Sequence, residues 1–279
     1  MFEIFKKLKF IGLIFKNNKI NPKSSNVLFV TYLKLLFKLI FIQKILRIKL
    51  SEEKILGYKI FFFDYEVLVA LFESIFIENE YYFISKKTNP SIMDLGSNIG
   101  LSVLYFKYLY PAAKIKAFEP DPTTFRLLKR TVETNKLRTV ELYEVAISNK
   151  KGFADFYTDQ DNPGSLLMSL DKYRLPKNKI KVKTDTLSTY VSENLDLLKM
   201  DVEGTETEIL LDLSKRKLFG KINKIIFEFH HNIVLNKNRF SRTLRILEKE
   251  GFNYQMVTKL RSPIGNLIFQ DILVYVIRR

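Results

Sequence analysis

From residue 90 onward, short apolar runs alternate with stretches of helical periodicity, and this alternation limits the folds open to the chain. The apolar runs that read as buried strands are 91–95, 115–118, 140–145, 195–200 and 224–229. Helix signals lie between them: Asp121 can cap a helix that begins at Pro122, and Thr205 and Glu208 have capping-box spacing. Strands that alternate with helices predict an α/β fold with a mostly parallel sheet covered on both faces.

The ends of this region carry further strand and helix signals. Two final strands, 252–257 and 267–277, are separated by a loop with Pro263 and Gly265, so we expect an antiparallel hairpin at one sheet edge. A helix with a stripe from Phe240 to Leu247 should stop at Gly251. An inserted β segment, 152–157 with 180–182, is expected over the carboxyl edge of the sheet. Upstream, 57–63 alternates as a strand and 66–76 is an amphipathic stretch.

The N-terminal segment is both basic and apolar. The chain carries a net charge of +16 over 279 residues, and residues 1–50 hold ten lysines and Arg47 against the single acid Glu3. Three interpretations of 27–50 stay open: a helix packed on the rest of the protein, a helix lying in a membrane interface, and a membrane span. Lys34 and Lys38 weigh against a span, since a lysine at the bilayer centre costs about 2.5–3.5 kcal/mol. We expect 1–56 to form a helical segment and 57–279 a second domain with its core at 90–279.

Composition excludes several classes of site and partner. The chain has no cysteine and two histidines, which excludes thiolate chemistry and disulfides and leaves little for a zinc cluster. Because most of the excess charge lies in an apolar segment, we expect no nucleic-acid partner but a peripheral contact of residues 1–50 with a membrane. No convincing secretory signal is evident, so we expect a cytoplasmic protein, at the inner membrane face where that contact forms.

The most informative run is Asp94-Leu95-Gly96-Ser97-Asn98-Ile99-Gly100, which follows a strand and opens a helix. Gly96 permits a sharp turn, and Gly100 should permit a close approach of the helix to the sheet. A dinucleotide-binding turn would need glycine where Asn98 and Leu101 stand. The run therefore predicts a ligand crevice without a pyrophosphate site.

An acid at the end of the next strand, Glu119, can accept hydrogen bonds from both hydroxyls of a ribose. Together with the turn it describes a nucleoside site that lacks phosphate recognition, and S-adenosylmethionine, with its ribose and positive charge, fits such a site. Ala146 and Ile147 follow the third strand and are placed to cover an adenine. The expected cofactor-binding residues are Asp94, Gly96, Ser97, Asn98, Gly100, Glu119, Pro120 and Ala146.

Four ordered blocks resemble the FkbM family of S-adenosylmethionine-dependent methyltransferases. They are residues 93–100, Phe118-Glu119-Pro120, residues 198–204 (LKMDVEG) and residues 226–230 (IFEFH). The resemblance covers about 190 residues, from near Glu80 to Phe269, and leaves the first 60 outside. It implies a Rossmann-like class I methyltransferase sheet and O-methylation, commonly of sugar hydroxyls in glycans or glycoconjugates.

Two pairs of polar groups end the fourth and fifth strands: Asp201 with Glu203, and Glu228 with His230. Each pair should point to one side of its strand while the chain stays extended, so the four groups can converge. We expect Glu228 and His230 to remove the acceptor's proton, and Asp201 and Glu203 to orient acceptor or cofactor. Asp201 or Glu228 could itself be the base if burial raises its pKa. An Mg²⁺ ion on Asp201, Glu203 and Glu228 is chemically open, but we expect no metal.

The sequence thus predicts an O-methyltransferase that uses S-adenosylmethionine. An NAD-dependent oxidoreductase on a related sheet and a non-catalytic membrane-surface module are the alternatives. An RNA methyltransferase is less favoured, because the charge excess is not on the catalytic part. Ser165 and the 160–175 loop are placed to close over an acceptor.

Overall fold

The computed structural model describes residues 2–16, 25–158, 170, 178–231, 240–258 and 270–278. Its centre is a seven-stranded sheet of order β11-β12-β10-β9-β3-β4-β5. The strands are β3 (Ser91–Leu95), β4 (Lys114–Phe118), β5 (Val140–Tyr143), β9 (Leu197–Met200), β10 (Lys224–His231), β11 (Phe252–Thr258) and β12 (Gln270–Arg278). The run from β10 to β5 is parallel, and β12 pairs antiparallel with both β10 and β11. The predicted α/β sheet and its antiparallel hairpin are confirmed, with β11 at the edge.

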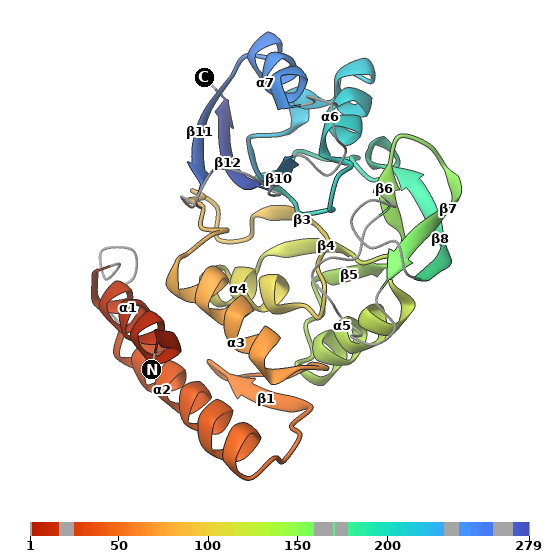
Figure 1. Cartoon of the computed structure of the whole chain (residues 1–279). Coiled ribbons are helices and arrows are strands. Elements are labelled where there is room, and N and C mark those ends of the chain that lie inside the picture. The colour runs from red at the N-terminus through yellow and green to blue at the C-terminus, as the bar shows by residue number, and fades with distance from the viewer. Residues whose placement is uncertain are drawn as a thin grey trace, which may run out of the picture.

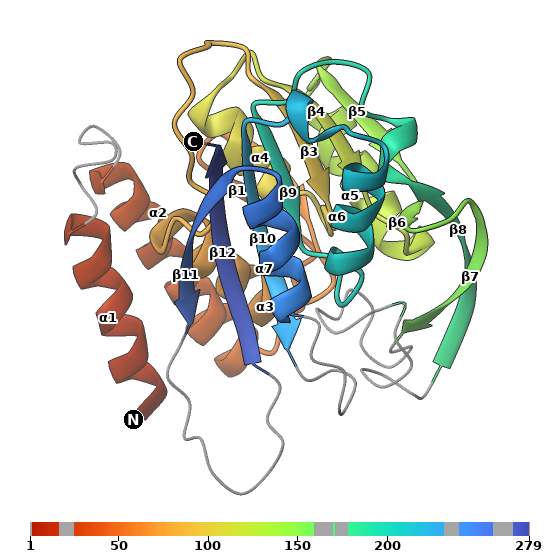
Figure 2. The same cartoon turned by 90° about the horizontal axis from the view of Figure 1, so that it is seen from above.

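Successive side chains along these strands supply two separate hydrophobic cores, one on each face. Helices cover both faces of the sheet (Figures 1 and 2). Ile92 and Leu197 pack on one side with α3 (Tyr65–Phe72), α4 (Leu101–Leu109) and α5 (Pro122–Thr134). Met93 and Leu198 pack on the other with α6 (Glu206–Lys215) and α7 (Phe240–Lys249). Both faces of the sheet are therefore closed, as near-continuous apolar strands require. The remaining short helices are η3 (Glu73–Ile77, a π-helical continuation of α3), η4 (Leu187–Thr189) and η5 (Phe219–Lys221).

The helix ends predicted from the sequence are confirmed at two places and wrong at a third. α7 ends at Lys249, and Gly251 follows with a φ of +79°, as predicted. The Asp121 side chain accepts a hydrogen bond from the Thr124 N–H at 2.7 Å, with Pro122 in the first turn of α5. The Thr205 hydroxyl instead donates to the carbonyl of Ile147, so the predicted capping box does not form. That hydrogen bond links the start of α6 to Ile147, in the strand that follows β5. The two residues are far apart in the sequence, so the local capping-box spacing could not predict this contact.

A separate three-stranded sheet follows β5, with the order β6-β8-β7. Its strands are β6 (Ala146–Ser148), β7 (Gly152–Thr158) and β8 (Asn178–Thr186). The inserted β segment is confirmed, although β8 is longer than predicted and β6 was not foreseen. β6 is three buried residues long, and it forms because β8 returns alongside it from over 30 residues later in the chain.

The N-terminal segment forms α1 (Phe2–Lys16) and α2 (Ser25–Phe37), which continues as the π-helix η2 (Lys38–Ile45). Figure 1 shows this helical pair on the outside of the helices that cover the sheet. The prediction of a helical segment over 1–56 is wrong at residues 52–55. These residues form β1 (Glu52–Ile55), which pairs antiparallel with β2 (Tyr58–Phe61). Leu56 and Gly57 both have positive φ, of 50° and 92°, and reverse the chain between the two strands.

Candidate functional site

A cavity of about 390 Å³ opens at the carboxyl ends of β3, β4, β9 and β10. One end is lined by the Gly96 turn, Glu119 and the apolar side chains of Ala146 and Ile147. The other end is lined by polar side chains from the ends of β9 and β10: Asp201, Glu203, Glu228 and His230. The volume falls within the usual range for small-molecule sites. The sheet therefore holds its crevice where parallel α/β sheets place their ligands.

The glycine-rich turn has the backbone that its sequence predicts. Gly96 has a φ of +77°, Asn98 of +47° and Gly100 of +95°. A Cβ atom at Gly96 would lie 1.9 Å from the carbonyl oxygen of Asp201, so the turn passes directly over the end of β9. At Gly100 the close neighbour is Leu128 Cδ1 of α5, at 2.8 Å from such a Cβ atom. The close approach at Gly100 is thus between α4 and α5, and not between helix and sheet as predicted.

Glu119 lies at the cavity and is held by the chain on both sides. Its Oε2 accepts the Asn98 N–H at 3.0 Å, and its Oε1 accepts the Asp121 N–H at 2.9 Å. Burial raises the pKa of Glu119 to about 8, against the opposing effect of those two donors. Ser97, Pro120 and the predicted adenine cover, Ala146 and Ile147, also line the cavity. Ser165 lies outside the described residues.

Asp94 does not lie where the sequence suggested. Its carboxylate is fully buried behind the cavity wall, where it accepts a hydrogen bond from Ser102 at 2.6 Å and pairs with Lys199 at 3.1 Å. The parallel register of β3 and β9 sets Asp94 beside Lys199. Asp94 is therefore a structural partner of a buried lysine, and its charge is already compensated before any ligand arrives.

Lys199 is a central residue that the sequence reasoning passed over. Its ammonium donates to the carbonyls of Gly96 at 2.7 Å and Leu95 at 3.3 Å, and lies 4.9 Å from the Tyr81 ring centroid. Burial alone would lower the pKa of Lys199, but Asp94 and Asp201 raise it above its ordinary value, so the group stays charged. Lys199 thus fixes the glycine turn. A lysine inside the apolar run of β9 was the signal that could have revealed it.

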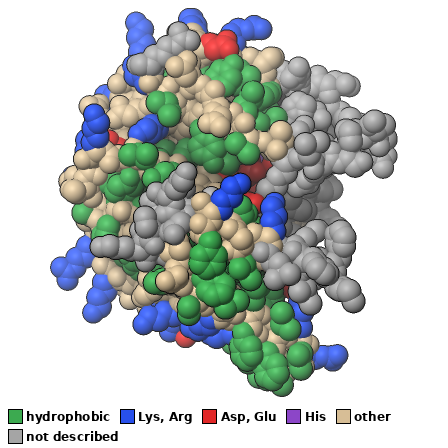
Figure 3. Space-filling view, turned by 90° about the vertical axis from the view of Figure 1, so that its left-hand side faces the viewer, with side chains coloured by type: hydrophobic (Ala, Val, Ile, Leu, Met, Phe, Trp, Pro, Cys, Tyr) green, Lys and Arg blue, Asp and Glu red, His purple; other side chains and the backbone are tan. Residues whose placement is uncertain are grey.

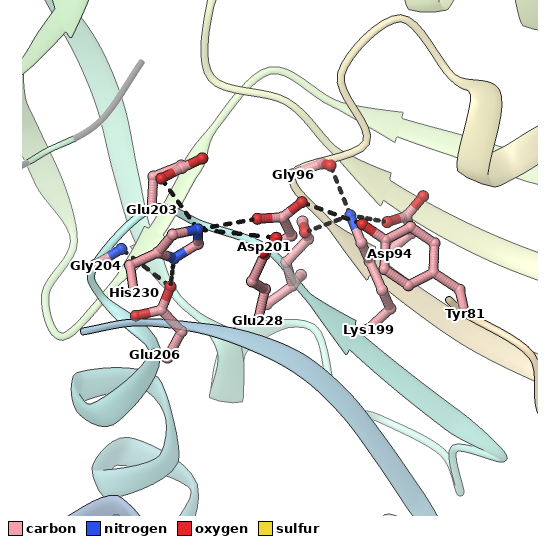
Figure 4. A network of polar contacts seen from close by, with 11 residues as sticks. Tyr81, Asp94, Gly96, Lys199, Asp201, Glu203, Gly204, Glu206, Glu228 and His230 are labelled. Atoms are coloured by element: carbon pink, nitrogen blue, oxygen red, sulfur yellow. Dashed lines mark hydrogen bonds and ion pairs between the residues drawn. The ribbon is translucent and has the colours of Figure 1, made fainter. Parts of the chain in front are cut away.

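The four predicted catalytic residues come together around one imidazole (Figure 4). His230 Nε2 lies 3.2 Å from Glu203 Oε2, 3.7 Å from Asp201 Oδ1 and 3.9 Å from Glu228 Oε2. His230 Nδ1 lies 2.9 Å from Glu206 Oε1 on α6. The imidazole is therefore surrounded by carboxylates on both of its nitrogens.

The carboxylates around His230 change its protonation, on which its predicted role as a base depends. Burial would lower its pKa, but Glu203, Glu206 and Asp201 outweigh that effect and raise the pKa of His230 to about 10. An imidazole with both nitrogens protonated at neutral pH cannot accept a proton. The pKa of Glu228 is also raised, but here burial itself acts upward: burial and repulsion by Asp201 raise it to about 9. Both groups are therefore mostly protonated at neutral pH, and Glu228, which has the lower pKa, is the first to become able to accept a proton as the pH rises.

The backbone brings Asp201 and Glu203 together differently from the prediction. β9 ends at Met200, and Glu203 has a φ of +59°, so the chain is turned and not extended at this point. Tyr81, which the sequence reasoning did not single out, donates its hydroxyl to Asp201 Oδ2 at 3.2 Å. The Asp201 Oδ1 atom is buried and accepts no hydrogen bond within the described chain. That oxygen faces His230 Nε2 at 3.7 Å.

Two overlapping groups have ligand atoms close enough to hold a divalent cation. One joins Asp201, Glu203 and His230, and the other joins Glu228, His230 and Asp271, each with its atoms within 4.8 Å of one another. Both groups share His230, whose proton occupies the centre of the cluster when the imidazole is charged. Metal binding therefore requires loss of that proton first.

Comparison with known proteins gives a family match. The model of the methyltransferase FkbM domain matches residues 94–254, which spans the glycine turn, Glu119 and the carboxylate cluster. Methyltransferase sdnD of Sordaria araneosa is 31% identical over 172 residues, covering 50% of this chain and 66% of that protein. The 2-O-methyltransferase NoeI of Sinorhizobium fredii (strain NBRC 101917 / NGR234) is 31% identical over 142 residues, covering 45% and 58%.

Among solved structures, the methyltransferase FkbM from Methylobacillus flagellatus KT is similar with a TM-score of 0.44 and 14% sequence identity. The similarity covers 76% of this chain and 53% of that one.

Proposed function

Because this chain belongs to the methyltransferase FkbM domain family, we propose that it transfers a methyl group from S-adenosylmethionine to a hydroxyl of a sugar in a glycan or glycoconjugate. The chain is a methyltransferase, which sets aside the oxidoreductase and the non-catalytic module as alternatives. The name of one relative, a 2-O-methyltransferase, supports oxygen as the atom that is methylated. The sugar acceptor rests on the resemblance of the sequence blocks to the family.

One observation carries this proposal: a single cavity joins the Gly96 turn and Glu119 to the cluster around His230. Carboxyl groups line both ends of the cavity, and its two cations, Lys199 and His230, already face carboxylates, so a cationic ligand is favoured over a polyphosphate. The apolar side chains of Ala146 and Ile147 fit a flat base, and Glu119 fits a ribose diol. S-adenosylmethionine supplies a methyl group carried on a positively charged sulfur.

We assign the proton-accepting role to Glu228. A hydroxyl that attacks a methyl carbon must lose its proton, and a carboxylate with a pKa near 9 is a stronger base than an ordinary glutamate. His230 stays protonated and positions the carboxylates around it, with Glu206 fixing its ring. Asp201 Oδ1 is then placed to accept a hydrogen bond from the acceptor, while Tyr81 holds the other oxygen of that carboxylate.

Isothermal titration calorimetry tests the cofactor site directly. The full chain should bind S-adenosylmethionine and its demethylated product, and should not bind NADH. Glu119→Ala should abolish that binding, whereas Glu133→Ala, at an exposed position of α5, should not. Asp94→Ala is a poor test, because it would leave Lys199 buried and unpaired. Unchanged affinity in Glu119→Ala would exclude the assigned site.

The acceptor needs a second measurement. Mass spectrometry of glycans incubated with the enzyme and S-adenosylmethionine should reveal a mass increase of one methylene on a sugar. The cytoplasmic location and the absence of a nucleic-acid partner stay predictions. The absence of a nucleic-acid partner agrees with the position of the charge excess in residues 1–50, outside the part of the chain that matches the family.

A further inference from the structure

The helix formed by α2 and η2 is apolar on two opposite sides, of which one is buried against the protein and the other is exposed. Tyr32, Leu35 and Leu39 are buried against the rest of the protein. The two lysines that interrupt the apolar sequence turn toward the β1–β2 hairpin: Lys38 Nζ lies 2.7 Å from Glu53 Oε2, and Lys34 Nζ lies 3.4 Å from Glu53 Oε1. These lysines therefore serve the packing of the helix.

A second buried carboxylate, Glu73 of η3, fastens the same helical pair. The Tyr32 hydroxyl and the Lys7 ammonium each lie 2.6 Å from Glu73 Oε1. The continuous helix Ser25–Ile45 is long and apolar enough by length and composition to cross a membrane. Moving it into a bilayer would strip Glu53 and Glu73 of their partners, and an unpaired buried charge is strongly destabilising. The packing thus argues against a span.

The opposite side of this helix, which we name the apolar face, presents large hydrophobic side chains to the outside. Its members recur at helical spacing: Val27, Val30, Leu33, Phe37, Ile40, Phe41 and Ile45. Val30, Phe37 and Ile45 are each at least 60% exposed. Only 22% of the most apolar window of the helix is buried, unlike that of a core helix. A contiguous patch of this kind marks an interaction surface.

The charge around the apolar face selects one class of partner. Arg47 and Lys49 are exposed just beyond the helix, where they alternate with the exposed Leu46 and Ile48. Figure 3 shows hydrophobic side chains running down the lower part of this side of the molecule, with Lys and Arg side chains beside them. Residues 1–50 have a net charge of +10, of which Glu53, Glu66 and Glu73 neutralise only part, so two copies meeting through this face would repel. Anionic lipid headgroups complement both the charge and the apolar surface.

We propose that the apolar face lies in the headgroup region of an anionic membrane, with the axis of α2 parallel to the membrane surface. The helical pair packs on η3, and Ser74 and Ile75 of η3 line the cavity. Membrane binding through this face therefore holds the cavity one helix layer away from the bilayer. This inference does not depend on the identity of the cofactor or the acceptor.

Vesicle co-sedimentation of the full chain tests the proposal. The protein should sediment with vesicles that contain phosphatidylglycerol, much less with pure phosphatidylcholine, and sodium chloride should release part of it. The triple variant Val30→Ser, Phe37→Ser, Ile45→Ser should lower the partition coefficient about a hundredfold, since each side chain loses its insertion into the lipid. Phe153→Ser is the control, because Phe153 is 74% exposed and its strand, β7, lies on the opposite side of the molecule from α2 (Figure 1). It should bind vesicles like the unchanged protein.

Thermal unfolding of all variants, by circular dichroism, establishes that the exposed substitutions leave the fold intact. The proposal is overturned if the triple variant folds and binds anionic vesicles as well as the unchanged protein does. It is also overturned if light scattering shows a dimer that the triple variant dissociates while vesicles bind neither form. Protein that only detergent, and not carbonate or salt, extracts from vesicles would indicate a span in place of the interfacial position.

Discussion

Replacing Gly96 with alanine should disturb the site through an overlap of the new Cβ atom with Asp201. A control glycine with nearly the same φ but no such overlap separates this effect from backbone strain. The new Cβ atom would lie 1.9 Å from the Asp201 carbonyl oxygen and 3.0 Å from its carbonyl carbon. Both chain segments are fixed, because the Asp201 N–H donates to the Leu95 carbonyl at 3.0 Å and Lys199 binds the Gly96 carbonyl. The turn or the end of β9 must therefore move by about 1 Å, a displacement that can lower the rate about a hundredfold.

Gly251 supplies the control. Its φ of +79° matches the +77° of Gly96, but a Cβ atom there would meet nothing within 4 Å. Gly251→Ala should thus lose only the cost of a left-handed alanine, about 1–2 kcal/mol. Gly96→Ala should lose that amount and about 1–3 kcal/mol more from the overlap.

Urea unfolding measures the stability of both variants, and calorimetry with S-adenosylmethionine measures the site. Only Gly96→Ala should weaken binding, by about a hundredfold. If the two variants bind and unfold alike, then the contact between the turn and β9 does not organise the site, and the reasoning fails.

Three further predictions concern charged groups. The rate of methyl transfer should rise about tenfold per unit of pH from 7 toward 9, because the pKa of Glu228 is about 9 and the ionised form is the base; Glu228→Gln should remove this slope in a pH–rate profile, and a slope that persists contradicts the assignment. Glu53→Gln should destabilise the N-terminal helices by about 1–3 kcal/mol, seen as faster hydrogen exchange over Ser25–Ile45. Burial would raise the pKa of Glu53, but Lys38 and the Lys54 N–H lower it below its ordinary value, so this stabilisation exists above about pH 4.5 and disappears as the pH falls through the folded-state pKa. Dialysis against EDTA should leave methyl transfer unchanged, since the charged imidazole of His230 already occupies the carboxylate cluster; a loss of activity that Mg²⁺ restores would show instead that a metal displaces its proton.

Local sequence signals were sufficient for the central sheet and for the meeting of the Gly96 turn and Glu119 at one cavity. Period and composition place the strands, and the carboxyl ends of neighbouring parallel strands meet at one edge. The Gly96 turn and Glu119 each follow directly from such a strand end, so their meeting at one cavity needed no long-range information. The convergence of Asp201, Glu203, Glu228 and His230 followed from the same argument, although the backbone at Glu203 differs from the extended form expected.

The roles of the individual charged groups depended on tertiary contacts. Whether His230 is a base or a fixed cation depends on Glu206, which α6 brings to its Nδ1 atom, and on three carboxylates that surround Nε2. From the sequence, Asp94 was predicted to bind the cofactor. In the structure, the register of β3 and β9 places it beside Lys199, with which it forms an ion pair. A pKa depends on burial and on distances between charges, and a linear sequence specifies neither.

The N-terminal helix shows the same division. Its sequence determined a basic, apolar helix, and that pattern suits packing on a domain and lying on a membrane equally well. Only the folded chain separates the two sides, because the buried carboxylates of Glu53 and Glu73 select which face turns inward. The sequence determined the elements and their chemistry, whereas packing decided which groups neutralise one another and which remain open to a partner.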